Sequence, residues 1–133
     1  MSEDARGTKA DHPVLALIAH DGRKDEMVAF ARDHKEKLSG FRLLATATTG
    51  TLLREQVGLT VETCLSGPLG GDVQIAARVA TGEVNAVIFL VNPLNAHPHD
   101  PDIQAIQRVC NVHNVPLATN VATAVLIATA TSI

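Results

Sequence analysis

The sequence predicts a single α/β domain built on an open, mainly parallel five-stranded sheet with helices on both faces, a three-layer arrangement of the Rossmann type. Short apolar runs recur along the chain, each followed by polar or glycine-bearing residues and then by helix-like periodicity. Parallel strands are joined by right-handed helical crossovers, so this alternation covers both faces of the sheet. At 133 residues, 46% of them apolar, the chain suffices for one ordinary domain but not two.

The predicted strands are the apolar runs at residues 14–19, 43–45, 61–65, 86–91 and 116–118. Apolar residues at helical spacing predict helices that include residues 27–34, 73–80 and 103–110, with shorter helices over 51–57 and 121–128. The connections from helices back into strands are short and chemically plain. Polar residues therefore gather after the strands rather than before them.

The two ends of the chain differ in character. The first residues are polar and acidic, without the apolar core of a secretory signal, so we expect a flexible tail over residues 1–12 and the domain over 13–133. The apolar segment 121–133 is shorter than the roughly 20 residues that span a bilayer. We expect a docked terminal helix there, and no membrane partner.

The composition also argues against nucleic acid as a partner. The net charge is -3, the Lys and Arg residues are scattered, and three Phe with no Tyr or Trp leave no platform on which bases could stack. Cys64 and Cys110 lie in apolar segments without CxxC spacing, so we expect buried free thiols rather than a disulfide or a zinc site. Free thiols favour a cytoplasmic location.

Every predicted strand is followed by a polar cluster. In an open parallel sheet, ligands bind beyond the carboxyl ends of the strands, so these clusters predict a site at that edge. The clusters are His20, Asp21 and Lys24; Thr46, Thr48 and Thr49; Ser66 to Asp72; Asn92, His97, His99 and Asp102; and Thr119 with Asn120.

The third cluster has the sequence SGPLGGD. Ser66, Gly67, Gly70 and Gly71 predict a phosphate cradle, because glycines let backbone N–H groups approach phosphate oxygens at a helix N-terminus. Asp72 would repel a bound phosphate. It is therefore either a helix cap or a group that takes a proton from a phosphorylated substrate.

The second cluster is open to two interpretations. Thr46, Thr48 and Thr49 either cap a helix start or form, with adjacent N–H groups, a second wall of the phosphate pocket. Lys24 is predicted in a first helical turn, where its charge opposes the helix dipole and a bound anion would compensate for it. The alternative is that Lys24 is an ordinary exposed side chain.

The fourth cluster, NPLNAHPHDPD, is the richest in ionisable groups. His97 and His99 with nearby carboxylates suggest a metal site, but Pro98 restricts the backbone and no third ligand stands out, so we predict no metal. Asp102 suits an N-cap or first-turn acid, and His99 suits proton transfer between oxygens. His20 is the rival for the second role.

Four segments, in order along the chain, carry a family likeness: AHDGRKDEMVAF, LLATATTG, LSGPLGGDVQIAARVA and NPLNAHPHDPDIQAIQRVCNVHNVPLATNVATA. From about Leu15 to Ile127 the chain resembles the methylglyoxal synthase family. The resemblance implies a carbon–oxygen lyase that converts dihydroxyacetone phosphate into methylglyoxal and inorganic phosphate. It also implies no metal or organic cofactor, and assembly as a homohexamer.

The resemblance also implies roles for single residues. Asp72 matches the base that takes a proton from C3 of the substrate, His99 the histidine that polarises the carbonyl, and Asp102 a second acid that orients the site. The implied substrate-binding residues, mostly on the phosphate, are His20, Lys24, Thr46, Thr48, Thr49, Ser66, Gly67 and Gly71.

The chain departs from the family pattern at two positions. Asn92 stands where the family usually has Asp, and Ala47 where it usually has Gly. Loss of the carboxylate removes a charge that could tune His99 or Asp102. Two other functions therefore stay open: an activity-impaired relative, and a non-catalytic phosphate- or nucleotide-binding regulatory module of the same fold.

Overall fold

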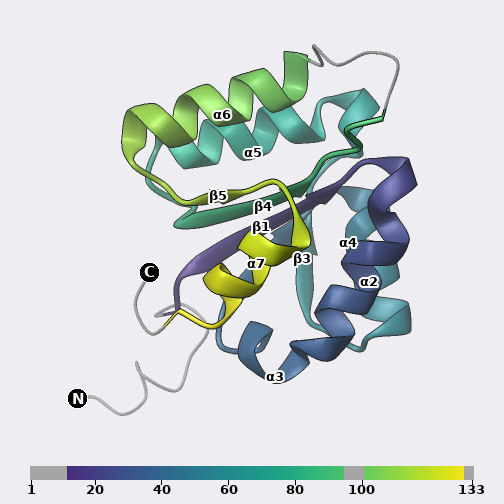
Figure 1. The fold of residues 1–133 in the computed structure, drawn as a ribbon. Coiled ribbons are helices and arrows are strands. Elements are labelled where there is room, and N and C mark those ends of the chain that lie inside the picture. The colour runs from purple at the N-terminus through teal and green to yellow at the C-terminus, as the bar shows by residue number, and fades with distance from the viewer. Residues whose placement is uncertain (1–11, 95–100, 131–133) are drawn as a thin grey trace, which may run out of the picture.

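The computed structural model describes residues 12–94 and 101–130, and these form a five-stranded parallel sheet in the order β3-β2-β1-β4-β5 (Figure 1). The strands are β1 (Val14–Ala19), β2 (Arg42–Ala45), β3 (Val61–Thr63), β4 (Ala86–Leu90) and β5 (Leu117–Ala118). Strand order reverses at β1, which pairs with β2 on one side and β4 on the other. The predicted open parallel sheet is confirmed.

Helices cover both faces of the sheet. The α-helices are α2 (Lys24–Asp33), α3 (Lys35–Leu38), α4 (Ala47–Gln56), α5 (Gly71–Ala80), α6 (Pro101–His113) and α7 (Val121–Ala128), with short 3₁₀ turns η2 (Asp21–Arg23) and η3 (Gly67–Leu69). In Figure 1, α5 and α6 lie side by side on one face, and α2, α4 and α7 lie on the other. The three-layer architecture is therefore confirmed.

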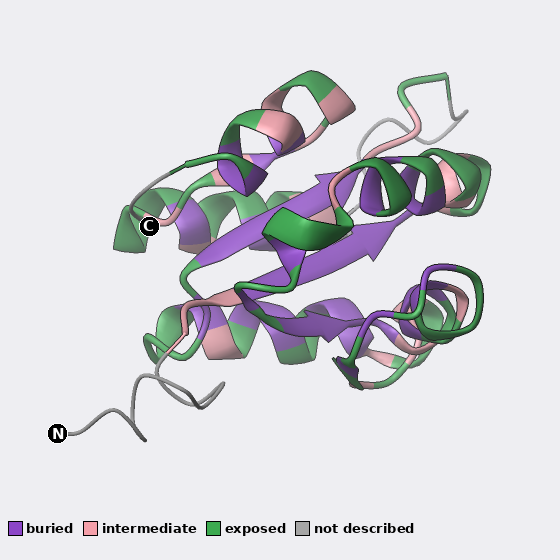
Figure 2. Ribbon diagram, turned by 90° about the horizontal axis from the view of Figure 1, so that it is seen from below, coloured by how far each residue is buried: buried purple, intermediate pink, exposed green. Residues whose placement is uncertain are grey.

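Successive side chains of β1 point to opposite faces of the sheet, and the hydrophobic core is divided into two clusters, one on each face. Leu15 and Leu17 pack with the apolar faces of α2, α4 and α7, whereas Ala16 and Ile18 pack with those of α5 and α6. This is the period of two expected of a strand that is covered on both sides. Figure 2 shows the central strands buried along their length, so the sheet is a rigid base whose carboxyl edge carries the polar loops.

Several element boundaries differ from those predicted, most of them by one residue and two of them by more. Helix α4 begins at Ala47 rather than at residue 51, because Thr48 and Thr49 take helical positions that their β-branched side chains disfavour but tertiary packing permits. Strand β3 ends at Thr63 rather than at residue 65. The short helix α3 was not predicted at all, since four residues are too few for a periodic pattern.

The C-terminal apolar segment packs as a docked helix, as predicted. Ala124, Ile127 and Ala128 of α7 are buried against the sheet. Within residues 12–94 and 101–130, no helix combines the length and the apolar character needed to cross a bilayer. Residues 1–11 lie outside the described part of the chain, so the predicted tail over 1–12 and the domain boundaries 13–133 stay predictions.

Candidate active site

A cleft of about 540 Å³ opens at the carboxyl edge of the sheet, where strand order reverses at β1. This volume lies in the range of small-molecule sites. The lining residues come from the end of β1, from the segments that follow β1, β2, β3 and β4, and from the first turns of three helices. They are Ile18, Ala19, His20, Asp21, Gly22, Lys24, Thr46, Thr48, Ser66, Gly67, Pro68, Asp72 and Asn92. Polar loops far apart in the sequence therefore share one cleft.

Asp72 is the second residue of α5, and its side chain is buried, with 6% exposure. The N-cap of α5 is Gly70, so Asp72 is not the cap that one interpretation of the sequence suggested. A Cβ atom on Gly67 would lie 3.4 Å from Oδ2 of Asp72 and 3.5 Å from Oδ1. The absence of a side chain at Gly67 thus keeps the space beside the carboxylate open to a ligand.

The glycine turn before α5 needs its glycines for two different reasons. Gly70 has φ +105°, a left-handed conformation that favours glycine. A Cβ atom on Gly71 would lie 1.8 Å from the carbonyl oxygen of Leu65, so only glycine fits there. Gly71 does not line the cleft, and its observed role is to let α5 begin close against the end of β3.

Of the three threonines predicted to form a second wall of the pocket, Thr46 and Thr48 line the cleft and Thr49 does not. Thr46 is the N-cap residue of α4, but its side chain makes no capping hydrogen bond, and it lines the cleft together with Thr48. The first amides of a helix have no intrahelical acceptor, so this end of α4 can donate to an anion. Thr49 is 1% exposed and does not line the cleft, so its hydroxyl does not extend the wall.

Lys24 reaches the cleft from the first position of α2. Its Nζ atom donates to the carbonyl oxygen of Ala19 at 2.8 Å and to Oδ1 of Asp21 at 3.0 Å. These contacts compensate for a cation at a helix N-terminus, and the hydrogen bond and charge of Lys24 lower the pKa of Asp21. An ammonium has three protons, so a further one is left for a ligand.

His20 is oriented by the loop after β4. The backbone N–H of Asn92 donates to Nδ1 of His20 at 3.1 Å, so the proton of the neutral imidazole is on Nε2. The ring also packs edge-on against Phe89. Oδ1 of Asn92 accepts from the N–H of Leu94 at 3.1 Å. Asn92 therefore holds the rim of the cleft through its backbone N–H and its side-chain oxygen.

Some predicted site residues are not placed with the others. His97 and His99 lie outside the described residues, and Asp102 is the second residue of α6 but its side chain is likewise outside the description. Within the described ranges, no three His, Cys, Asp or Glu side chains are grouped as a metal site would need. Thr119 and Asn120 lie at the same sheet edge but line a different cleft.

Sequence reasoning did not assign a role to several lining residues. Gly22 and Pro68 line the cleft, and a Cβ atom on Gly22 would lie 2.7 Å from Nδ2 of Asn92. The adjacent pairs Asp21-Gly22 and Gly67-Pro68 are turn signals in the sequence, and that signal could have marked both positions as parts of the rim.

Both cysteines are free thiols, as predicted. Cys110 is a buried residue of α6, and desolvation raises its pKa to about 11. Cys64 is only half-buried, against the expectation of full burial, because its position just after β3 is near the outer edge of the sheet. Burial nevertheless raises its pKa. Both sulfurs therefore stay protonated near neutral pH and are poor nucleophiles.

The fold and the cleft define a class of protein. An open parallel sheet that carries a buried carboxylate, a lysine and uncapped helix starts at its switch point is an α/β protein for a small anionic ligand. Residues 26–119 match the model of the MGS-like domain family. The chain belongs to the methylglyoxal synthase family.

Proteins named as methylglyoxal synthases match this chain over most of their length. The chain is 65% identical to the methylglyoxal synthase of Thermus thermophilus over 110 residues, 83% of this chain and 87% of that protein. It is 58% identical to that of Ralstonia nicotianae, over 85% of this chain and 84% of that protein. A crystal structure of methylglyoxal synthase from Elizabethkingia anophelis superposes with a TM-score of 0.84 at 42% identity, covering 90% of this chain and 79% of that one. The predicted family and the prediction of an enzyme are confirmed.

Proposed function

We propose that this enzyme converts dihydroxyacetone phosphate into methylglyoxal and inorganic phosphate through an enediolate. The observation that carries the proposal is the buried Asp72 carboxylate beside Gly67, in the same cleft as Lys24 and Thr46. This cleft combines a base with several donors for an anion. A phosphorylated triose needs both, because it carries a dianionic phosphate and an acidic C–H next to a ketone.

Asp72 is proposed as the base. A proton on carbon beside a ketone is far less acidic than a carboxylic acid, so its abstraction from C3 requires a donor aimed at the carbonyl oxygen. His99 was predicted to supply that donor and lies outside the described residues. In the part of the chain that is described, His20 lines the cleft with its proton on Nε2, and it is our candidate for an additional donor.

The second step is loss of phosphate. The proton of the C3 hydroxyl passes to the departing phosphate, the C2–C3 double-bond electrons move to C1–C2, and the C1–O bond to phosphate breaks. The enolate that results takes up at C1 one proton, equivalent to the one first removed from C3, to give methylglyoxal. The sequence of steps is redox-neutral, so it needs no oxidant or reductant.

The phosphate-binding residues would decide between elimination and isomerisation. Elimination requires the C1–O bond to stand roughly perpendicular to the enediolate plane, whereas an isomerase holds it in that plane. Lys24 on one side and the Thr46 and Ser66 loops on the other could fix this torsion and balance the charge of the departing phosphate.

The test is an assay with purified protein. Dihydroxyacetone phosphate is added, and methylglyoxal and inorganic phosphate are both followed, with Asp72→Asn in parallel. We expect equal release of the two products by the wild type and a loss of at least about 100-fold in Asp72→Asn. Binding of phosphate without any turnover would instead favour the regulatory module or the impaired relative. The regulatory module is disfavoured because the chain covers 87% of a relative named as the synthase.

Assembly and location belong to the same proposal. The predicted homohexamer is tested by sedimentation velocity or light scattering of the purified chain, where a monomer or dimer would contradict it. The predicted cytoplasmic location is supported by two free thiols, Cys64 and Cys110.

A further inference from the structure

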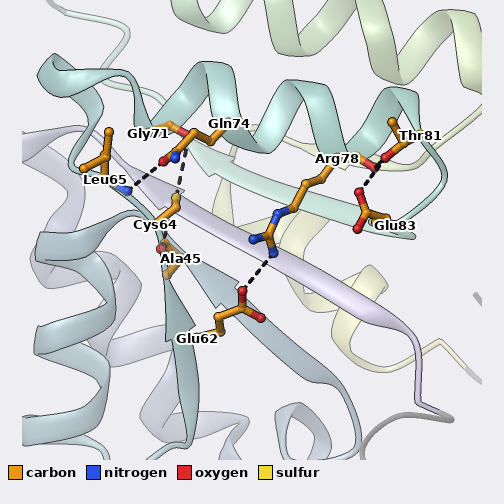
Figure 3. A network of polar contacts seen from close by, with 9 residues as sticks. All are labelled: Ala45, Glu62, Cys64, Leu65, Gly71, Gln74, Arg78, Thr81 and Glu83. Atoms are coloured by element: carbon orange, nitrogen blue, oxygen red, sulfur yellow. Dashed lines mark hydrogen bonds and ion pairs between the residues drawn. The ribbon is translucent and has the colours of Figure 1, made fainter.

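A set of polar contacts joins the end of β3 to helix α5 (Figure 3). Oε1 of Gln74 accepts a hydrogen bond from the backbone N–H of Leu65 at 2.8 Å. The thiol of Cys64 lies 3.6 Å from the carbonyl oxygen of Gly71, and Arg78 forms an ion pair with Glu62 at 2.9 Å. The contact made by Gln74 reaches Leu65, which directly precedes Ser66 at the start of the predicted phosphate cradle.

The Leu65 amide needs this partner because β3 is an edge strand. The N–H of Cys64 points inward and donates to the carbonyl oxygen of Ala45 on β2, so the next N–H along the chain points to the outer side. Within the described part of the chain, no strand lies on that side of β3. The side chain of Gln74 supplies the acceptor that a neighbouring strand would otherwise provide.

The position of Gln74 links two parts of the cleft. It lies two residues after Asp72 in the first part of α5, and its partner Leu65 directly precedes Ser66 and Gly67. At the other end of this loop, the N–H of Gly71 donates to the carbonyl oxygen of Ser66, and Gly71 packs against Leu65. The Leu65–Gln74 bond thus closes the loop that runs from the end of the strand into the helix.

We infer that Gln74 is a positioning residue, which holds the Ser66–Gly67 segment at a set distance from the Asp72 carboxylate by fixing the Leu65 amide. The side chain does not line the cleft and is exposed. It acts on a bound anion only through the loop. The inference rests on the proposed function only in naming that anion as the phosphate of the substrate.

The test is direct binding of inorganic phosphate and of phosphoglycolate by calorimetry, on the intact chain. Gln74→Met removes the acceptor while keeping length and helix propensity. We expect affinity for both ligands to fall by about three- to tenfold, the effect of one hydrogen bond. In turnover assays KM should rise by a similar factor while kcat changes less than about twofold.

Two further variants separate positioning from a general loosening of α5. Arg78→Met breaks the Arg78–Glu62 ion pair on the same helix without touching the loop, and it should bind phosphate like the wild type. Gln74→Glu keeps an acceptor oxygen, and at raised ionic strength, where its added charge is screened, it should recover most of the affinity. In wild-type protein the Leu65 amide should exchange with solvent more slowly than in Gln74→Met.

Each outcome of these measurements either supports or overturns the positioning role of Gln74. Unchanged phosphate affinity in Gln74→Met, an equal loss in Arg78→Met, or rapid exchange of the wild-type Leu65 amide would overturn the inference. If the wild type binds phosphate but makes no methylglyoxal, the proposed function fails, while the binding comparison still tests Gln74. If the wild type is active and Gln74→Met has the same KM, the proposed function stands and the role of Gln74 fails.

Discussion

Two clefts of similar volume lie at the carboxyl edge of this sheet, about 540 Å³ near β1, β2 and β3 and about 490 Å³ near β4 and β5. In the second cleft, helix α7 begins with a closed cap, because Oδ1 of Asn120 accepts from the N–H of Thr123 at 2.9 Å. In the first cleft, α4 and α5 begin at Thr46 and Gly70 with no side-chain cap. The starts of α4 and α5 therefore lack the side-chain cap that the start of α7 has.

The charged groups of the two clefts differ in their carboxylates. Arg23 in the second cleft and Lys24 in the first each donate to a backbone carbonyl and pair with a nearby carboxylate. The first cleft holds the buried Asp72 and a lysine whose carboxylate partner, Asp21, is fully exposed to solvent. The comparison teaches that volume does not identify a reactive site. In our proposal, the buried Asp72 carboxylate and the uncapped starts of α4 and α5 do.

The largest expected effect comes from the base. Asp72→Asn should lower turnover by at least about 100-fold while leaving phosphate affinity equal or higher, because a negative charge is removed beside the anion. Steady-state kinetics and calorimetry measure the two quantities. Turnover equal to that of the wild type would remove the chemical distinction between the two clefts.

Removal of the cation should have the next largest effect. Lys24→Met keeps the aliphatic stem and deletes a charge-assisted hydrogen bond, so phosphate should bind about 10- to 100-fold more weakly. The matched control is Arg23→Met, which deletes a cation from the second cleft. If both variants bind phosphate equally poorly, the cation effect reflects net charge rather than the cleft.

The glycine beside the base should matter less. Gly67→Ala places a Cβ atom 3.4 Å from Oδ2 of Asp72, at the close limit of van der Waals contact, and so fills the space beside the carboxylate. We expect kcat/KM to fall by about tenfold, since misplacement of the substrate relative to its proposed base is costly. A thermal melt close to that of the wild type would show that the fold is kept, and unchanged kcat/KM would mean that the cleft tolerates a narrower entrance.

The N-cap residues of α4 and α7, Thr46 and Asn120, give a matched pair of variants for comparing the two clefts. Asn120→Ala should cost about 1 kcal/mol of unfolding free energy, because it deletes a cap, with little change in turnover. Thr46→Val should do the reverse, raising KM by severalfold with a smaller loss of stability, because its hydroxyl caps nothing. Denaturant titration gives the unfolding free energy of each variant, and steady-state kinetics gives its KM. If both variants changed stability and KM in the same way, the two helix starts would not differ in function.

The smallest effect is expected at Asn92. Its backbone N–H orients His20 and its side-chain oxygen accepts from Leu94, and an aspartate could make both contacts. Asn92→Asp should therefore change kcat by less than about threefold. A much larger increase would identify Asn92 as the cause of impaired activity, as one interpretation of the sequence held.

Much of the fold was predictable because its signals are local. The strand at Val14–Ala19 and the helix at Val121–Ala128 were predicted at their observed bounds from apolar patterning. Asp72 and Lys24 were predicted as site residues and do share a cleft, although their chemical roles stay predictions. Gln74 was not marked, because an exposed glutamine on a helix surface has no pattern that separates it from a solvating residue.

The sequence by itself determined the α/β class, the order of its elements and the edge at which polar residues gather, because periodicity and strand–loop alternation are properties of neighbouring residues. Only the tertiary structure decided which polar clusters share a cleft. Thr46 lines it while Thr49 is buried, and Asn120 faces a second cleft instead. Which residues line a cleft depends on how the helices pack on the sheet and on whether a side chain caps each helix start. The packing of helices on the sheet is set by contacts between residues distant along the chain, which the local pattern of the sequence does not reveal.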